Sequence, residues 1–104
     1  MILKEDILRK IHSDFGENAN NAINVLNKAV EEITYHETDR VLRCIIFLAK
    51  GSIDELHKHI EVAELDARDV MFQAEYEKIF GESDFKRLRD FNKTFEESTN
   101  DVRE

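Results

Sequence analysis

Acidic and histidine side chains share one face of a predicted helix in the middle of the chain. Asp54, His57 and Glu61 stand at positions i, i+3 and i+7, and Glu64 continues the same face. Carboxylate and imidazole groups at this spacing can bind a hard or borderline cation. No second helix clearly offers the Glu-x-x-His pattern of a two-metal bundle. These residues are therefore only a weak candidate metal site, and we expect no cofactor.

A second polar series, Glu32, His36 and Arg40, is spaced at four-residue intervals if one helix continues through it. A carboxylate, an imidazole and a guanidinium can do acid–base work, but nothing nearby suggests a nucleophile or an oxyanion hole. Cys44 is the single cysteine and lies among apolar residues without a base that could activate it, so we interpret it as a core residue. The sequence favours a protein without catalytic activity but leaves an enzyme open.

The segment Asp66-Ala67-Arg68-Asp69-Val70 is the most informative polar stretch. Asp66 suits the N-cap of a helix, where a carboxylate accepts hydrogen bonds from free backbone N–H groups. Arg68 is followed by Phe72 and Tyr76, and arginine flanked by aromatic residues is a composition that protein interfaces favour. We therefore include Arg68, Phe72 and Tyr76 among the candidate interaction residues, beside the simpler interpretation of helix capping.

Two helices separated by a short turn, over residues 53–64 and 66–76, also have the size of a helix-turn-helix. The helix that would enter the DNA groove carries Asp69, Glu75 and Glu77, which repel phosphate. The whole chain has 23 acidic and 15 basic residues among 104, a formal net charge of −8, of which −7 belongs to residues 52–104. A nucleic-acid binder needs a basic footprint, so we expect no nucleic-acid partner. An acidic face suits solubility or a basic partner.

The elements that must position these residues are organised around an apolar run at residues 40–51, which predicts a helix at residues 39–50. Its side chains cover most of a helix circumference, which is typical of a core helix, and its length is too short for a membrane span. Thr38 is expected to cap its start, and Lys50 and Gly51 to end it. Arg43 and Lys50 hold its narrow polar stripe, and Phe47 lies beside that stripe. Arg43 and Phe47 are therefore the second group of candidate interaction residues.

The remaining elements follow from periodicity and turn residues. Amphipathic patterns predict helices at residues 3–14, 18–35, 53–64 and 66–76. Ser52 and Glu55 form a capping box at the start of the third of these. A break at Leu65-Asp66 is preferred to one long helix over 53–80. Ser83 is expected to cap a last helix that carries Phe85, Leu88, Phe91 and Phe95, packed either on its own domain or on a second chain.

Composition and local pattern agree on this architecture. The chain has no proline and three glycines, which favours helices joined by short turns. The fold class we predict is all-α, a compact bundle of five or six short helices around the central helix. Residues 1–95 form one domain, and residues 96–104 form a polar, frayed tail. With no signal-peptide pattern and no possible intrachain disulfide, we expect a cytoplasmic protein with no membrane contact.

Within residues 40–76 the chain resembles a set of small bacterial proteins of unknown function. The resemblance rests on Arg40-Val41, Leu48-Ala49-Lys50-Gly51, Leu56, Ile60-Glu61-Val62-Ala63, Asp66-Ala67-Arg68-Asp69-Val70 and Ala74-Glu75-Tyr76. It implies a compact, helical, cytoplasmic protein and carries over no catalytic or binding residue.

The function we predict is a non-enzymatic protein–protein interaction or regulatory module whose partner is another protein or a second copy in a homodimer. It rests on the scattered phenylalanines of a small domain, which an oligomer would bury. The alternatives are a metal-dependent or acid–base enzyme that uses the surface His/Glu/Asp cluster, and a helix-turn-helix nucleic-acid binder.

Overall fold

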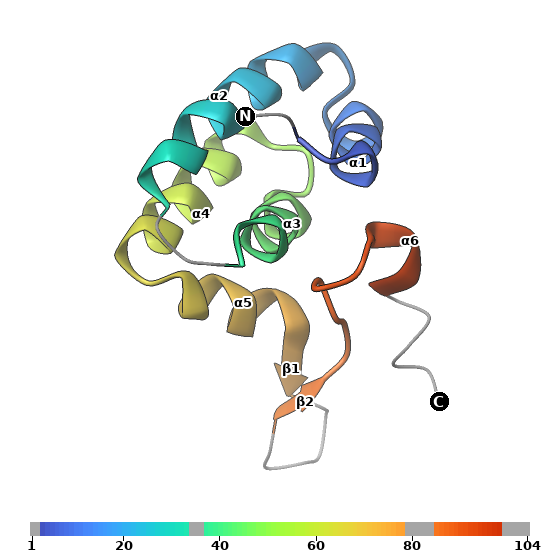
Figure 1. Cartoon of the computed structure of the whole chain (residues 1–104), viewed down its shortest axis with the longest axis vertical. Coiled ribbons are helices and arrows are strands. Elements are labelled where there is room, and N and C mark those ends of the chain that lie inside the picture. The colour runs from blue at the N-terminus through green and yellow to red at the C-terminus, as the bar shows by residue number, and fades with distance from the viewer. Residues whose placement is uncertain (1–2, 34–36, 79–84, 99–104) are drawn as a thin grey trace.

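The computed structural model describes residues 3–33, 37–78 and 85–98, most of which are helical (Figure 1). This confirms the predicted all-α fold class. The elements in chain order are α1 (Glu5–Phe15), the 3-10 turn η1 (Gly16–Asn18), α2 (Ala19–Glu32), α3 (Thr38–Ala49), α4 (Ile53–Leu65), α5 (Ala67–Glu75), β1 (Tyr76–Lys78), β2 (Phe85–Arg87) and α6 (Phe95–Ser98). Within those three stretches, every helix is too short or too polar to cross a membrane.

Helix α3 is the centre of the fold, as predicted, and contacts α1, α4 and α5. All residues from Val41 to Ile46 are buried, which requires neighbours on every side of the helix. The start of α3 differs from the expectation. Thr38 is the first helical residue and Glu37 is the N-cap, without a side-chain capping bond.

Gly51 ends α3 and also lets α1 approach closely. Lys50 and Gly51 both have positive φ, 50° and 82°, so the chain reverses there. A Cβ atom on Gly51 would lie 2.3 Å from the backbone oxygen of Asp14 in α1. Glycine is therefore needed at this position both for the backbone conformation and for the space.

The α4–α5 boundary follows the local sequence signals. The Ser52 hydroxyl accepts a hydrogen bond from the Glu55 N–H at 3.2 Å, but the Ser52 N–H donates to the carbonyl of Ala49 rather than to Glu55, so half of the predicted capping box forms. Helix α4 ends at Leu65, which confirms the predicted break. The Asp66 carboxylate then accepts from the Arg68 N–H at 3.0 Å and caps α5.

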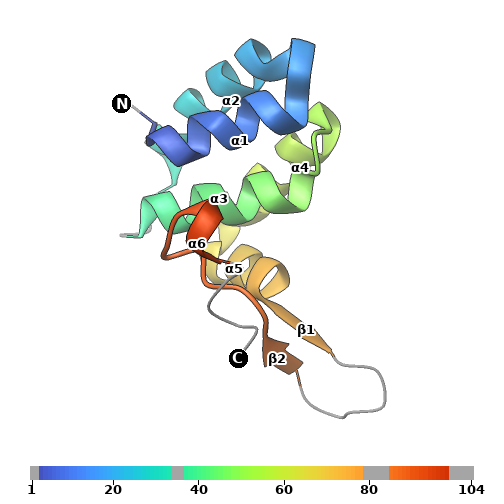
Figure 2. The same cartoon turned by 90° about the vertical axis from the view of Figure 1, so that its right-hand side faces the viewer.

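The predicted last helix is wrong. Phe85 lies in β2, which pairs antiparallel with β1, with Lys78 opposite Phe85 and Tyr76 opposite Arg87. Figure 2 shows the two strands projecting away from the helices. After β2 the chain is irregular and passes beside α3, where Phe91 is 1% exposed. The burial of Phe91 in the core therefore outweighs the weak preference for a helix that the spacing of the phenylalanines indicates.

The ends of the domain match the predictions only partly. The chain forms α6 over Phe95–Ser98, and Ser98 is buried, whereas the sequence predicts a frayed tail from residue 96. Residues 99–104 of that tail, and Ser83, lie outside the described residues. Helix α2 ends at Glu32 rather than at residue 35.

Candidate functional site

Three aromatic side chains meet on the surface where α5 continues into the hairpin. Phe72 stacks on Tyr76 with 5.1 Å between ring centroids, and its ring meets Phe85 edge-on at 5.0 Å. Phe72 is 44% exposed and Phe85 51% exposed. We call Phe72, Tyr76 and Phe85 the aromatic face. Clustered and exposed aromatic side chains are more informative than scattered ones, because such patches mark contact sites.

The periodicity of α5 explains why this face is outward. Val70, Met71 and Ala74 are buried and face the bundle, so Phe72 is left on the opposite side. The strands extend the face, since residues opposite each other in a hairpin point to the same side. Tyr76 and Lys78 therefore share a side with Phe85.

A buried carboxylate next to the aromatic face links this face to the rest of the domain. Glu75 is fully buried, and its carboxylate accepts hydrogen bonds from Arg40 at 2.9 and 2.6 Å, from Arg87 at 3.2 Å and from the Phe91 N–H at 3.0 Å. Hydrogen bonding to Glu75 raises the pKa of Arg40 above its usual value. Four segments of the chain thus meet at one side chain. Sequence reasoning missed this role because Glu75 occurs among other acidic residues in a chain rich in them.

A second buried ion pair joins the two ends of the domain. The Arg43 guanidinium donates to Asp6 in α1 at 2.9 and 3.0 Å and to the Phe91 carbonyl at 3.2 Å. Asp6 also accepts from the Phe95 N–H at 3.2 Å. Burial acts to raise the pKa of Asp6, but the hydrogen bonds from Arg43 and Phe95 outweigh it and lower the pKa. The expected surface position of Arg43 is therefore wrong, because only 5% of this residue is exposed.

Phe47 is covered by the C-terminal part of the chain. Its ring lies 5.3 Å from that of Phe91, and the Arg89 guanidinium lies 4.5 Å above it. Of the five predicted interaction residues, the structure thus brings together Phe72 and Tyr76. Arg68 lies one turn before Phe72 on α5, exposed, and its guanidinium contacts Asp66 at 3.1 and 3.2 Å. The hydrogen bonds from Arg68 lower the pKa of Asp66.

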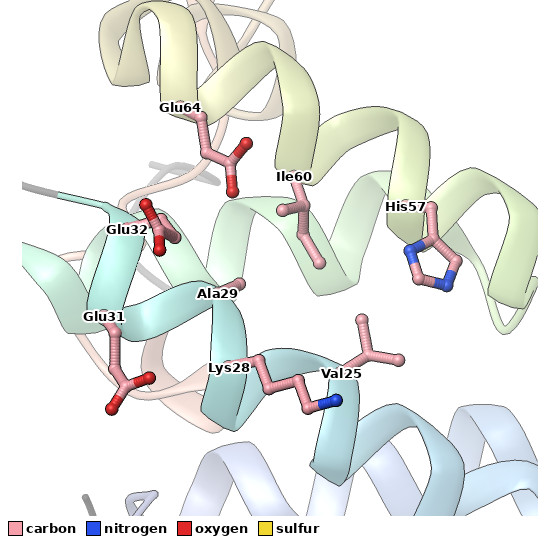
Figure 3. A pocket seen from close by; sticks show the side chains of 8 residues that line it. All are labelled: Val25, Lys28, Ala29, Glu31, Glu32, His57, Ile60 and Glu64. Carbon is pink, nitrogen blue, oxygen red and sulfur yellow. The ribbon is translucent and has the colours of Figure 1, made fainter.

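A shallow pocket of about 440 Å³ lies between α2 and α4 (Figure 3). Val25, Ala29 and Ile60 supply its apolar surface. Figure 3 shows Glu32 and Glu64 close together at one end, while His57 lies at the other. Lys28 and Glu31 complete the lining. The lining therefore combines an apolar surface with three carboxylates, one lysine and one histidine.

The described residues do not assemble the sequence-based metal candidate. Asp54, His57 and Glu61 are all exposed on α4. Among the described residues, no group of three His, Cys, Asp or Glu side chains could hold a metal ion. In the other series, Arg40 binds Glu75, and His36 lies outside the described residues.

Cys44 is a core residue, as predicted. It is fully buried in α3, and burial raises the pKa of its thiol. A buried thiol that stays protonated is a poor nucleophile.

Fold and surface together define a small helical domain with a projecting hairpin and an exposed aromatic face. Comparison of the chain with protein-family models, curated proteins and solved structures gave no match. The resemblance to small bacterial proteins stays a prediction.

Proposed function

We propose that this protein is a non-enzymatic protein–protein interaction or regulatory module and that the aromatic face is its contact surface. The observation that carries the proposal is the cluster of Phe72, Tyr76 and Phe85, half-exposed at the base of the hairpin. Aromatic side chains provide large contact areas at low cost in conformational entropy, and they dominate the binding energy of many interfaces.

The anchoring of this face also supports the proposal. Arg87 of β2 and Arg40 of α3 both bind the buried Glu75, the residue directly before Tyr76. A rigid surface loses little conformational entropy when a partner binds. The aromatic face is therefore preorganised for contact.

Charge supports a protein partner over a nucleic acid. The exposed side of α5 carries Arg68 and Asp69 one turn before Phe72, but Arg68 is paired with Asp66, and the chain has a net charge of −8. Phosphate binding requires the opposite sign of charge.

Site-specific photo-crosslinking tests the proposal. A benzophenone amino acid replaces Phe72, and a control protein carries it at Glu61, which is exposed on α4. Both proteins are irradiated in the cells that naturally express the chain. We expect adducts to a polypeptide from position 72 and none from position 61. Equal labelling from both positions, or none from position 72, would overturn the proposal.

A further inference from the structure

We propose that the partner of the aromatic face is a second copy of this chain, packed about a two-fold axis that passes near Phe72 and Tyr76, with the two α5 helices antiparallel. This inference rests on the proposed function, because it names the partner of the same surface. Three features support it. They are the charges at the two ends of the aromatic face, the apolar centre of that face, and the net charge of the chain.

The two ends of the face carry opposite charges. Arg68 and Asp69 are both exposed one helical turn before Phe72, and the Arg68 guanidinium is paired with Asp66. The Asp69 carboxylate is therefore the charge that remains at the α5 end. Lys78 is exposed in β1 opposite Phe85 and lies at the hairpin end. A two-fold rotation about a point between Asp69 and Lys78 exchanges the two ends. Asp69 of each copy is then placed against Lys78 of the other, and the surface is complementary to itself.

The centre of the face is apolar, and the same rotation superimposes apolar on apolar. Phe72 and Tyr76 lie between the two charged residues, with Phe85 beside Phe72. A buried aromatic centre with charged residues at its edge is the usual anatomy of a protein interface. The aromatic rings supply affinity, and the two Asp69–Lys78 contacts set the orientation.

The net charge of the chain makes the hairpin the favourable place for self-contact. Two copies that each carry −8 repel one another over most of their surfaces. Residues 76–87 carry no net charge, because Lys78, Lys86 and Arg87 balance Glu77, Glu82 and Asp84. This part of the chain therefore repels a second copy less than the rest of the acidic chain does.

Charge reversal tests the two-fold contact. Asp69→Lys places two pairs of lysines in opposition across the proposed axis, and Lys78→Asp places two pairs of aspartates there. Each variant alone should raise the Kd of the dimer about tenfold or more. At a protein concentration near the wild-type Kd, sedimentation equilibrium should therefore show mostly monomers for each variant.

A mixture of the two variants restores both contacts. The lysine introduced at position 69 of one copy meets the aspartate introduced at position 78 of the other. The unchanged Lys78 of the first copy meets the unchanged Asp69 of the second. Sedimentation equilibrium of the mixture should therefore show a heterodimer.

The controls separate loss of the two-fold contact from a general effect of charge and from unfolding. Glu61→Lys makes the same reversal of charge on α4 and should leave the mass of the dimer unchanged. Far-ultraviolet circular dichroism verifies that every variant keeps its helices. A wild-type chain that stays monomeric at millimolar concentration overturns the self-contact, as does a mixture that fails to associate. A crosslink from Phe72 to a different polypeptide would also overturn it, while leaving the proposed function intact.

Discussion

Glu75 and Arg40 form a two-point ion pair inside the protein, with hydrogen bonds of 2.6 and 2.9 Å between the fully buried carboxylate and the guanidinium. Arg40 lies at the start of α3 and Glu75 at the end of α5, so the pair fixes the two helices relative to each other. Such paired geometry is stronger than a single charge contact. The hairpin that begins at Tyr76 starts from this point.

We predict that Glu75→Gln lowers the free energy of unfolding by about 3 kcal/mol, because it leaves the Arg40 charge without its buried counter-charge. Glu61→Gln makes the same chemical change on the exposed side of α4 and should change stability by less than about 0.5 kcal/mol. Urea unfolding followed by circular dichroism measures both. Equal effects would show that the Glu75 network contributes no more than surface charge does.

Asp6 makes the free energy of unfolding depend on pH in the acidic range. Its pKa in the folded protein is below the ordinary value of 3.8, so the unfolded chain binds a proton more readily. The stabilisation is complete above that ordinary value and is lost as pH falls through the folded-state pKa. We expect Asp6→Asn to be less stable than the wild type near neutral pH and to lose less stability on acidification. Urea unfolding at about pH 7 and about pH 3 tests this, and parallel pH profiles for the two proteins would contradict it.

His59 adds a second pH dependence of stability, at a less acidic pH than that of Asp6. Burial lowers its pKa, its Nδ1 atom has no hydrogen-bond partner among the described residues, and Glu55 and Lys58 are the charged groups that act on it. The neutral form is therefore favoured in the fold, and stability should fall as pH drops below the ordinary value of 6.5. His59→Gln should flatten this part of the profile, whereas His57→Gln, at an exposed position, should not. Unchanged pH dependence in His59→Gln would exclude this role.

Truncation of Phe91 and of Phe85 should have different effects on stability and on contact through the aromatic face. Phe91→Ala removes a buried ring that contacts Phe47 and Phe95, and should cost roughly 3–5 kcal/mol. Phe85→Ala removes a half-exposed ring and should cost less than about 1 kcal/mol of stability while weakening any contact through the aromatic face. Thermal unfolding and sedimentation of the two variants measure the contrast. A stable Phe91→Ala protein would refute the assignment of this residue to the core.

Gly51 and Gly16 provide a matched pair of left-handed glycines. Alanine at Gly16 meets no atom within 4 Å and should cost about 1 kcal/mol for its backbone conformation. Alanine at Gly51 must in addition displace the Asp14 carbonyl, so it should cost at least about 2 kcal/mol more. Denaturant titration of both variants tests this, and similar losses would mean that α1 moves away easily.

Much of the fold was predictable because its signals are local. The apolar run of α3, the break at Leu65-Asp66 and the turn at Gly51 depend on residues within one or two helical turns of each other. The aromatic face could be predicted in part, since Phe72 and Tyr76 are four residues apart and share one side of the predicted helix over residues 66–76. The position of Phe85 beside them depends on the β-strand pairing. The local sequence did not reveal this pairing, because the spacing of the phenylalanines predicts a helix.

The sequence by itself thus determined helices α1 to α5, their order and the central position of α3, because helical periodicity and turn chemistry act over a few residues. Only the tertiary structure decided which charged residues are buried. Asp6 and Arg43 are 37 positions apart, and Glu75 and Arg40 are 35 apart. Nothing local distinguishes them from the many exposed charges of this chain. Their pairing is also what places Phe91 in the core and holds the hairpin, with its aromatic face, against the bundle.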